Sequence, residues 1–173
     1  MHIFIAILTI FFVWKQKVYK EWSKYHATML YFPICDLTYN FICTNYWLWK
    51  FDNDVLLPHT ILELVHFFIT FPGTVLLFLA QYPEKKAIQR KITYYLTWIG
   101  IYFVGEWLLL QVGGIIHSNG WSLGWSFFFD FIMFPMLRLH YKHPLIAYIL
   151  SVPIATFFIY LFDVPIHIPI EKR

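Results

Sequence analysis

The sequence predicts an all-α protein, a polytopic bundle of about six transmembrane helices, and composition, apolar run length and charge placement carry this prediction. Of the 173 residues, 60% are hydrophobic and 23% aromatic, and only 13% are charged. Soluble domains average roughly 45–50% apolar and 25% charged residues. Because so few charged side chains cannot cover a soluble protein, we expect one integral membrane domain over residues 1–173 that faces lipid.

Six apolar runs follow one another along the chain, and connections that hold most of the charge separate them. A helix that crosses a bilayer needs about 20 mostly apolar residues. The expected spans are about 1–14, 26–48, 56–80, 92–116, 121–139 and 143–163. After them, Pro165 and Pro169 predict an extended tail over 164–173.

The first run is short, because about 14 residues rise only ~21 Å against a hydrocarbon thickness of ~30 Å. We expect it to be tilted, extended by snorkelling lysines or partly interfacial. A signal peptide would carry its cations before the apolar stretch. Here Lys15 and Lys17 follow it, which favours an uncleaved anchor.

Ten of the thirteen cations fall on alternate connections, at 15–24, 84–91 and 138–143. The positive-inside tendency places such loops in the cytoplasm. Both termini are then expected outside, together with Asp52, Asp54, Asp163 and Glu171.

Four carboxylates interrupt the apolar runs: Asp36, Glu63, Glu106 and Asp130 lie in the second to fifth runs, one in each. A charge near the bilayer centre costs at least ~2.5–3.5 kcal/mol, so these groups must face one another, face a hydrated cavity, or be protonated. We expect the second to fifth helices to surround a polar centre that opens outward, with the first and sixth outside it.

The third run has the clearest polar face, because His59, Glu63 and His66 fall within an arc of about 60° at 100° per residue. With alternating helix directions, His59 and Glu63 lie at the same depth in the membrane as Glu106 and the His117-to-Gly120 loop, which includes Asn119. We therefore predict that Glu63, His66 and Glu106 approach one another in the outer half of the bundle. Asp36 and Asp130 are expected near mid-depth.

Three chemistries suit such a centre. A hydrogen-bonded structural network is the simplest, and no cofactor is predicted. A divalent metal is the second, because Glu63-x-x-His66 matches one helical unit of di-iron bundles, and His59, Glu63, His66, Glu106 and His117 are metal-ligand types. The third is proton or ligand handling, with a proton shared between Glu63 and its flanking histidines that titrates near neutral pH.

Other signatures are missing from the sequence. It has no phosphate loop and no dinucleotide fingerprint, and Gly124-Trp125-Ser126 lacks the second small residue of a nucleophile elbow. The cations are scattered over loops, which argues against nucleic acid as a partner. His140 and His143 accompany Arg138 and Lys142, and we interpret the four as a basic collar on anionic headgroups. The 19 Phe, 12 Tyr and 8 Trp predict lipid-facing bulk, or alternatively the lining of a cavity for an apolar or cationic ligand.

Leu57-Pro58-His59-Thr60, the His117-Ser118-Asn119-Gly120-Trp121 loop and Arg138-Leu139-His140 resemble, in order and spacing, an uncharacterised family of small multi-pass membrane proteins from spore-forming Gram-positive bacteria. The resemblance covers nearly the whole chain. It implies a bacterial plasma-membrane protein with several spans, and it assigns no activity to any residue.

Three functions fit the sequence. Buried carboxylates and histidines that face a cavity are typical of ion and proton pathways, which favours a small carrier or a proton-coupled solute- or ion-binding protein. One alternative is a membrane-embedded enzyme that acts on a lipid or isoprenoid, with Glu63 or Asp130 as general acid. The other alternative is a structural or partner-binding subunit. The lipid bilayer and a small apolar or ionic ligand are the expected partners.

Overall fold

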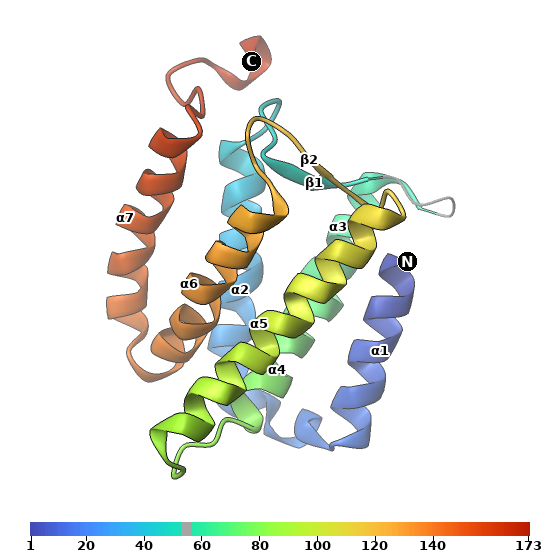
Figure 1. The fold of residues 1–173 in the computed structure, drawn as a ribbon, viewed down its shortest axis with the longest axis vertical. Coiled ribbons are helices and arrows are strands. Elements are labelled where there is room, and N and C mark those ends of the chain that lie inside the picture. Colours follow the sequence, from blue (N-terminus) through green and yellow to red (C-terminus); the bar gives the residue numbers. More distant parts are fainter. Residues whose placement is uncertain (53–56) are drawn as a thin grey trace.

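The structure is a computed structural model that describes residues 1–52 and 57–173, and it is a bundle of helices, as the sequence predicts (Figure 1). The helical elements are α1 (His2–Lys15), η1 (Val18–Glu21), α2 (Trp22–Ile42), α3 (His59–Val65), η2 (His66–Thr70), α4 (Phe71–Ala80), α5 (Ile88–Gln111), α6 (Leu123–Lys142), α7 (Pro144–Leu161) and η3 (Ile170–Lys172). Two short strands complete it, β1 (Trp49–Phe51) and β2 (Ile115–His117). Asp54, and position 56 where the third span was predicted to start, lie outside the described residues.

Successive rods alternate in direction, with α3, η2 and α4 forming one continuous rod (Figure 1). Both termini lie at the end of the bundle that carries β1 and β2, which we call the strand end. The connections at 16–21, 81–87 and 143 lie at the opposite end, which we call the basic end. The structure therefore gathers the predicted cation-rich loops at one end.

Two helices end earlier than the apolar runs that predicted them. The second run extends to 48, but α2 ends at Ile42 and Asn45 has a left-handed backbone with φ of 63°. The fourth run extends to 116, but α5 ends at Gln111, and Gly113 turns the chain with φ of 68°. A left-handed residue interrupts a helix, and glycine adopts that conformation at least cost.

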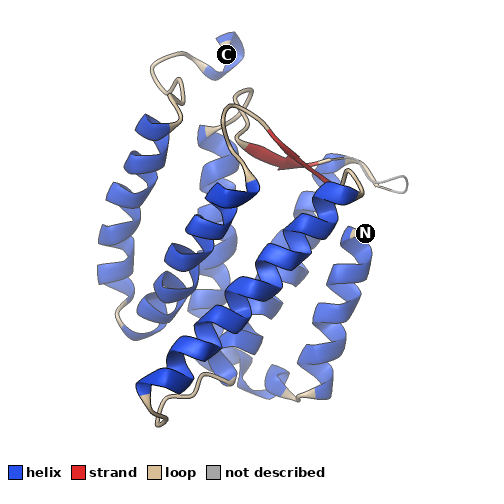
Figure 2. Ribbon diagram, viewed as in Figure 1, coloured by secondary structure: helices blue, strands red, loops and turns tan. Residues whose placement is uncertain are grey.

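The residues after these two turns form an antiparallel strand pair instead of more helix (Figure 2). Trp49 lies opposite His117, and Phe51 lies opposite Ile115. The Tyr39 hydroxyl of α2 anchors the first strand, because it donates to the Trp49 carbonyl at 2.5 Å and accepts from the Trp49 amide at 2.7 Å. The pair thus joins the ends of α2 and α5 across the bundle.

The core lies where α2, α4 and α6 meet, with α5 and α7 packed on α6. Phe78 and Phe134 are fully buried, with ring centroids 5.2 Å apart, and Val75 and Leu137 are buried beside them. α1 packs on α4 through Gly73, where a Cβ atom would collide with the Thr9 side chain. Large aromatic side chains therefore fill the centre, and the lack of a Cβ atom at Gly73 lets α1 pack closely on α4.

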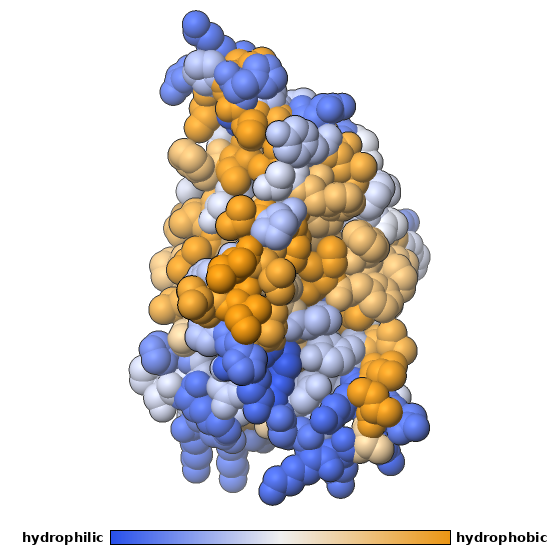
Figure 3. Space-filling view, turned by 90° about the vertical axis from the view of Figure 1, so that its left-hand side faces the viewer, coloured by the Kyte–Doolittle hydropathy of each residue, from blue (hydrophilic) through white to orange (hydrophobic). Residues whose placement is uncertain are grey.

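On the face drawn in Figure 3, an apolar band lies across the middle of the molecule between two hydrophilic ends. Within the described residues, two rods are long and apolar enough to cross a membrane, at 59–80 and 144–161. A third candidate arises if α1 and the helix from Val18 to Ile42, which meet at 78°, count as one span.

Candidate functional site

The strand-end half of α2 carries a buried acid. Asp36 is only 8% exposed, and the Asn40 side chain one turn later donates from Nδ2 to Asp36 Oδ2 at 3.2 Å and to the Asp36 carbonyl at 3.1 Å. Thr44 Oγ1 in turn donates to the Asn40 carbonyl at 2.7 Å. An ionised carboxylate has about four lone-pair sites, so Asp36 keeps capacity for further donors.

α3 brings a second acid to the same depth. His59, at the start of α3, places Nδ1 2.8 Å from the Phe51 carbonyl and Nε2 3.8 Å from Glu63 Oε1. A carbonyl oxygen only accepts, so Nδ1 of His59 carries a hydrogen. Nε2 of neutral His59 then presents a lone pair toward Glu63, and a proton on either group makes the pair attractive.

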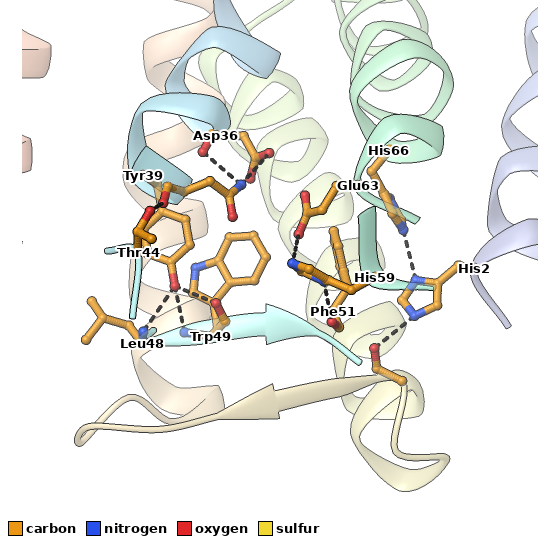
Figure 4. A network of polar contacts seen from close by, with 12 residues as sticks. His2, Asp36, Tyr39, Thr44, Leu48, Trp49, Phe51, His59, Glu63 and His66 are labelled. Atoms are coloured by element: carbon orange, nitrogen blue, oxygen red, sulfur yellow. Dashed lines mark hydrogen bonds and ion pairs between the residues drawn. The ribbon is translucent and has the colours of Figure 1, made fainter. Parts of the chain in front are cut away.

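Asp36 and Glu63 line one groove between α2 and α3, which we call the α2–α3 groove. Its volume is about 730 Å³, and the two carboxyl groups interact electrostatically across it. Figure 4 shows Asp36 on α2 and Glu63 on α3, both directed into the space between the helices. Asn40, Thr44, His59 and Thr60 supply further polar lining, and no described lysine or arginine lines the groove.

His66 faces away from this groove, toward α1 (Figure 4). Its Nε2 lies 2.9 Å from His2 Nδ1, and His2 Nε2 lies 2.8 Å from the Gly114 carbonyl. Because that carbonyl only accepts, a neutral His2 donates from Nε2 and accepts at Nδ1 from His66. His66 Nδ1 then holds a lone pair, and it has no hydrogen-bond partner in the described part of the chain.

Glu106 belongs to a separate network at the strand end of α5 and α6. Its Oε1 lies 2.7 Å from His117 Nε2 and accepts from Ser126 Oγ at 2.5 Å, and Trp121 Nε1 donates to the same hydroxyl at 2.8 Å. The imidazole and the hydroxyl both contact Glu106 rather than each other. The arrangement therefore orients Ser126 without giving it a histidine base.

Asp130 follows Ser126 by one turn of α6 and is 5% exposed. Its Oδ2 is buried and, among the described residues, has no hydrogen-bond partner, and its carboxyl group interacts electrostatically with Glu106. Glu106 and Asp130 thus form a second acid pair.

Asn119 is exposed and donates to the Trp47 carbonyl at 2.8 Å, which links two loops of the strand end.

The single cluster expected from Glu63, His66 and Glu106 is divided into three groups. Glu63 faces α2, His66 faces α1, and Glu106 faces α6 and β2. The 60° arc on the third rod is wide enough to reach a neighbour on either side, and α5 packs mainly on α6. Of the predicted metal ligands, His59 meets Glu63 and His117 meets Glu106, while His66 lies apart from both pairs. No metal-holding group of three His, Cys, Asp or Glu occurs within residues 1–52 and 57–173.

The predicted basic collar is wrong for His140. This residue is 1% exposed, its Nδ1 lies 2.9 Å from Thr28 Oγ1, and its ring stacks on Tyr31 at 4.1 Å between centroids. His140 therefore points from α6 against α2, where Thr28 supplies a hydrogen-bond partner and Tyr31 an aromatic face. Arg138 and Lys142 pair with Glu84, and His143 is exposed at the helix break.

Sequence reasoning missed two features of the site. His2 stands at the edge of an apolar run without a polar neighbour, and only the tertiary contact with His66 shows its use. β1 and β2 have three residues each, too few for an alternating pattern to be recognised. The signal that was available was Tyr39, which shares a helix face with Asp36 and anchors β1.

Comparison of the chain with protein-family models, with curated proteins and with solved structures found no match.

Proposed function

We propose that the chain is a multi-pass protein of a bacterial plasma membrane, in which all six rods cross the bilayer. The basic end faces the cytoplasm, and the strand end with both termini faces outside. The apolar band between hydrophilic ends supports this proposal (Figure 3), as do the cations gathered at the basic end.

Single cysteines test this topology. In a background with Cys35→Ala and Cys43→Ala, Lys86→Cys and Glu171→Cys place exposed thiols at the basic end and in the C-terminal tail. We expect a membrane-impermeant maleimide to label position 171 in intact cells, and position 86 only after permeabilisation. Labelling of position 86 in intact cells would contradict the orientation.

We further propose that the protein is a small, proton-coupled carrier that binds a cationic solute in the α2–α3 groove. One observation carries this proposal: two acids from different helices, Asp36 and Glu63, line a groove of about 730 Å³ that no described lysine or arginine neutralises. Intramembrane carboxylates that face a cavity typically mark ion and substrate pathways. The His59–Glu63 pair supplies a proton acceptor beside the site.

Uptake of butyltrimethylammonium into proteoliposomes tests the carrier, because this cation has no uncharged form that crosses lipid alone. We expect uptake with the native protein and with Asp163→Asn, a matched control that removes an exposed carboxylate. Asp36→Asn and Glu63→Gln should each abolish it while they elute normally in size-exclusion chromatography. No uptake by the native protein under any pH gradient would overturn the carrier proposal.

A further inference from the structure

The α2–α3 groove has an apolar mouth and an acidic interior. Leu37 is 57% exposed and Phe41 is 68% exposed on α2, whereas Asp36, which precedes Leu37, is 8% exposed. Leu64 on α3 is 45% exposed on the facing side. If the rods cross a bilayer as proposed, the mouth opens sideways to lipid and the carboxylates lie behind it.

The polar interior is rich in acceptors and poor in donors. Glu63 Oε1 is buried and accepts no hydrogen bond within the described residues, and the Asn40 amide is the side-chain donor that the two carboxyl groups share. One Asp36 oxygen accepts from Asn40, and the Thr44 hydroxyl already donates to a backbone carbonyl. Two ionised carboxylates near one another repel, and either a proton or an opposing charge relieves the repulsion; His59, on the Glu63 side, is the one basic side chain of the described lining. A cation is the complementary occupant.

The groove is far larger than an inorganic ion requires. Ligand sites for drug-sized molecules span about 300–1,000 Å³, and 730 Å³ falls in this range. The volume beyond the acids is lined by Ile34, Leu37, Phe41 and Phe67. These side chains suit a hydrocarbon chain, and aromatic faces also attract a cationic head.

We propose that the α2–α3 groove binds an amphiphilic organic cation, with an ammonium head between Asp36 and Glu63 and an apolar chain along Leu37 and Phe41. This inference rests on the proposed carrier function and names the class of its substrate. It explains why acid side chains and exposed apolar side chains share one groove.

The test compares octyltrimethylammonium, butyltrimethylammonium and octan-1-ol by titration calorimetry on protein in nanodiscs, with empty nanodiscs subtracted. Four buried methylene groups should make the octyl cation bind on the order of 100-fold more tightly than the butyl cation. Octan-1-ol should show no saturable binding. Asp36→Asn and Glu63→Gln should each abolish octyl binding, and Asp163→Asn should retain it.

A second pair of variants tests where the apolar tail of the octyl cation binds. Leu37→Trp fills the mouth and should reduce the octyl-to-butyl ratio at least tenfold while butyl binding persists. Ile149→Trp makes a similar change on exposed α7 and should leave the ratio unchanged.

Equal affinities for the two cations would overturn the amphiphile inference and leave the carrier standing. Saturable binding of octan-1-ol with the affinity of the octyl cation would overturn the role of charge. Binding of neither cation, together with no uptake, would overturn both this inference and the proposed function.

Discussion

Backbone carbonyls dictate the proton positions of two histidines, His2 and His59. The Gly114 carbonyl requires a hydrogen on His2 Nε2, and this in turn makes His66 the donor to His2. At the other site, the Phe51 carbonyl fixes the hydrogen of His59 on Nδ1. The first series of hydrogen bonds runs from His66 through His2 to the Gly114 carbonyl and contains no acid, whereas the second ends at the Glu63 carboxyl group, which can exchange a proton.

The hydrogen bonds from His66 through His2 to Gly114 are predicted to serve a structural role. His2→Phe leaves a donor on His66 and an acceptor on Gly114 without this partner, and each unsatisfied buried group costs about 1–3 kcal/mol. We expect the free energy of unfolding in detergent to fall by roughly 2–4 kcal/mol. His26→Phe, at an exposed imidazole, is the control and should change it by less than about 0.5 kcal/mol. An unchanged stability of His2→Phe would exclude the imidazole chain.

The contacts from the Phe51 carbonyl through His59 to Glu63 are predicted to serve function, through the Glu63 carboxyl group. Cation binding requires the carboxylate, so affinity should fall as pH is lowered and the group takes up a proton. Calorimetry in two buffers of different ionisation enthalpy should detect proton release on binding of butyltrimethylammonium. Glu63→Gln should remove this release, and a Glu63→Gln variant with the full pH response would show that another group titrates.

Among the elements, the helices follow from the sequence and the contacts between them do not. Apolar runs located all six rods, because a helix built mostly of apolar side chains leaves a long apolar stretch in the sequence. The strand pair escaped notice, because Trp49–Phe51 is held by Tyr39 and by a partner strand more than sixty residues away. His140 escaped notice for the same reason, since Thr28 and Tyr31 of another helix bury it.

The candidate site was predicted in part. Depth along the helices indicated which acids lie inside the bundle, and helical spacing put His59 and Glu63 together. Spacing could not show which neighbour each face meets, because two helices flank the third rod. Asp36 therefore lies near Glu63, and Glu106 contacts His117, so two separate groups replace the single predicted cluster.

The contact between α1 and α4 depends on Gly73. Gly73→Ala would place a methyl group against Thr9, so we expect a loss of about 1–3 kcal/mol in the free energy of unfolding. Thr9→Ser removes the colliding methyl, and the double variant should recover most of this loss. Gly100→Ala is the control, because nothing lies within 4 Å of its added atom. Additive losses in the double variant would show that the two residues do not meet.

At the scale of the whole molecule, the proposed membrane position, which rests on the hydrophilic ends and the apolar band, would make the bilayer part of the site. The strand end ties α2 to β1 and β1 to β2, while α2 and α3 leave the groove between them. The polar groups of the groove are buried, and its rim is among the exposed apolar surface. The central claim is therefore that this groove opens to lipid within the membrane.

Accessibility of a nitroxide spin label tests that claim most directly. In the cysteine-free background reconstituted into liposomes, Leu37→Cys places the label at the mouth of the groove, and Lys86→Cys places it at the basic end. We predict that oxygen, which concentrates in hydrocarbon, relaxes the label at 37 far more than a water-soluble nickel chelate does, and that the order reverses at 86. Strong relaxation by the nickel chelate at both positions would contradict a groove that opens to lipid.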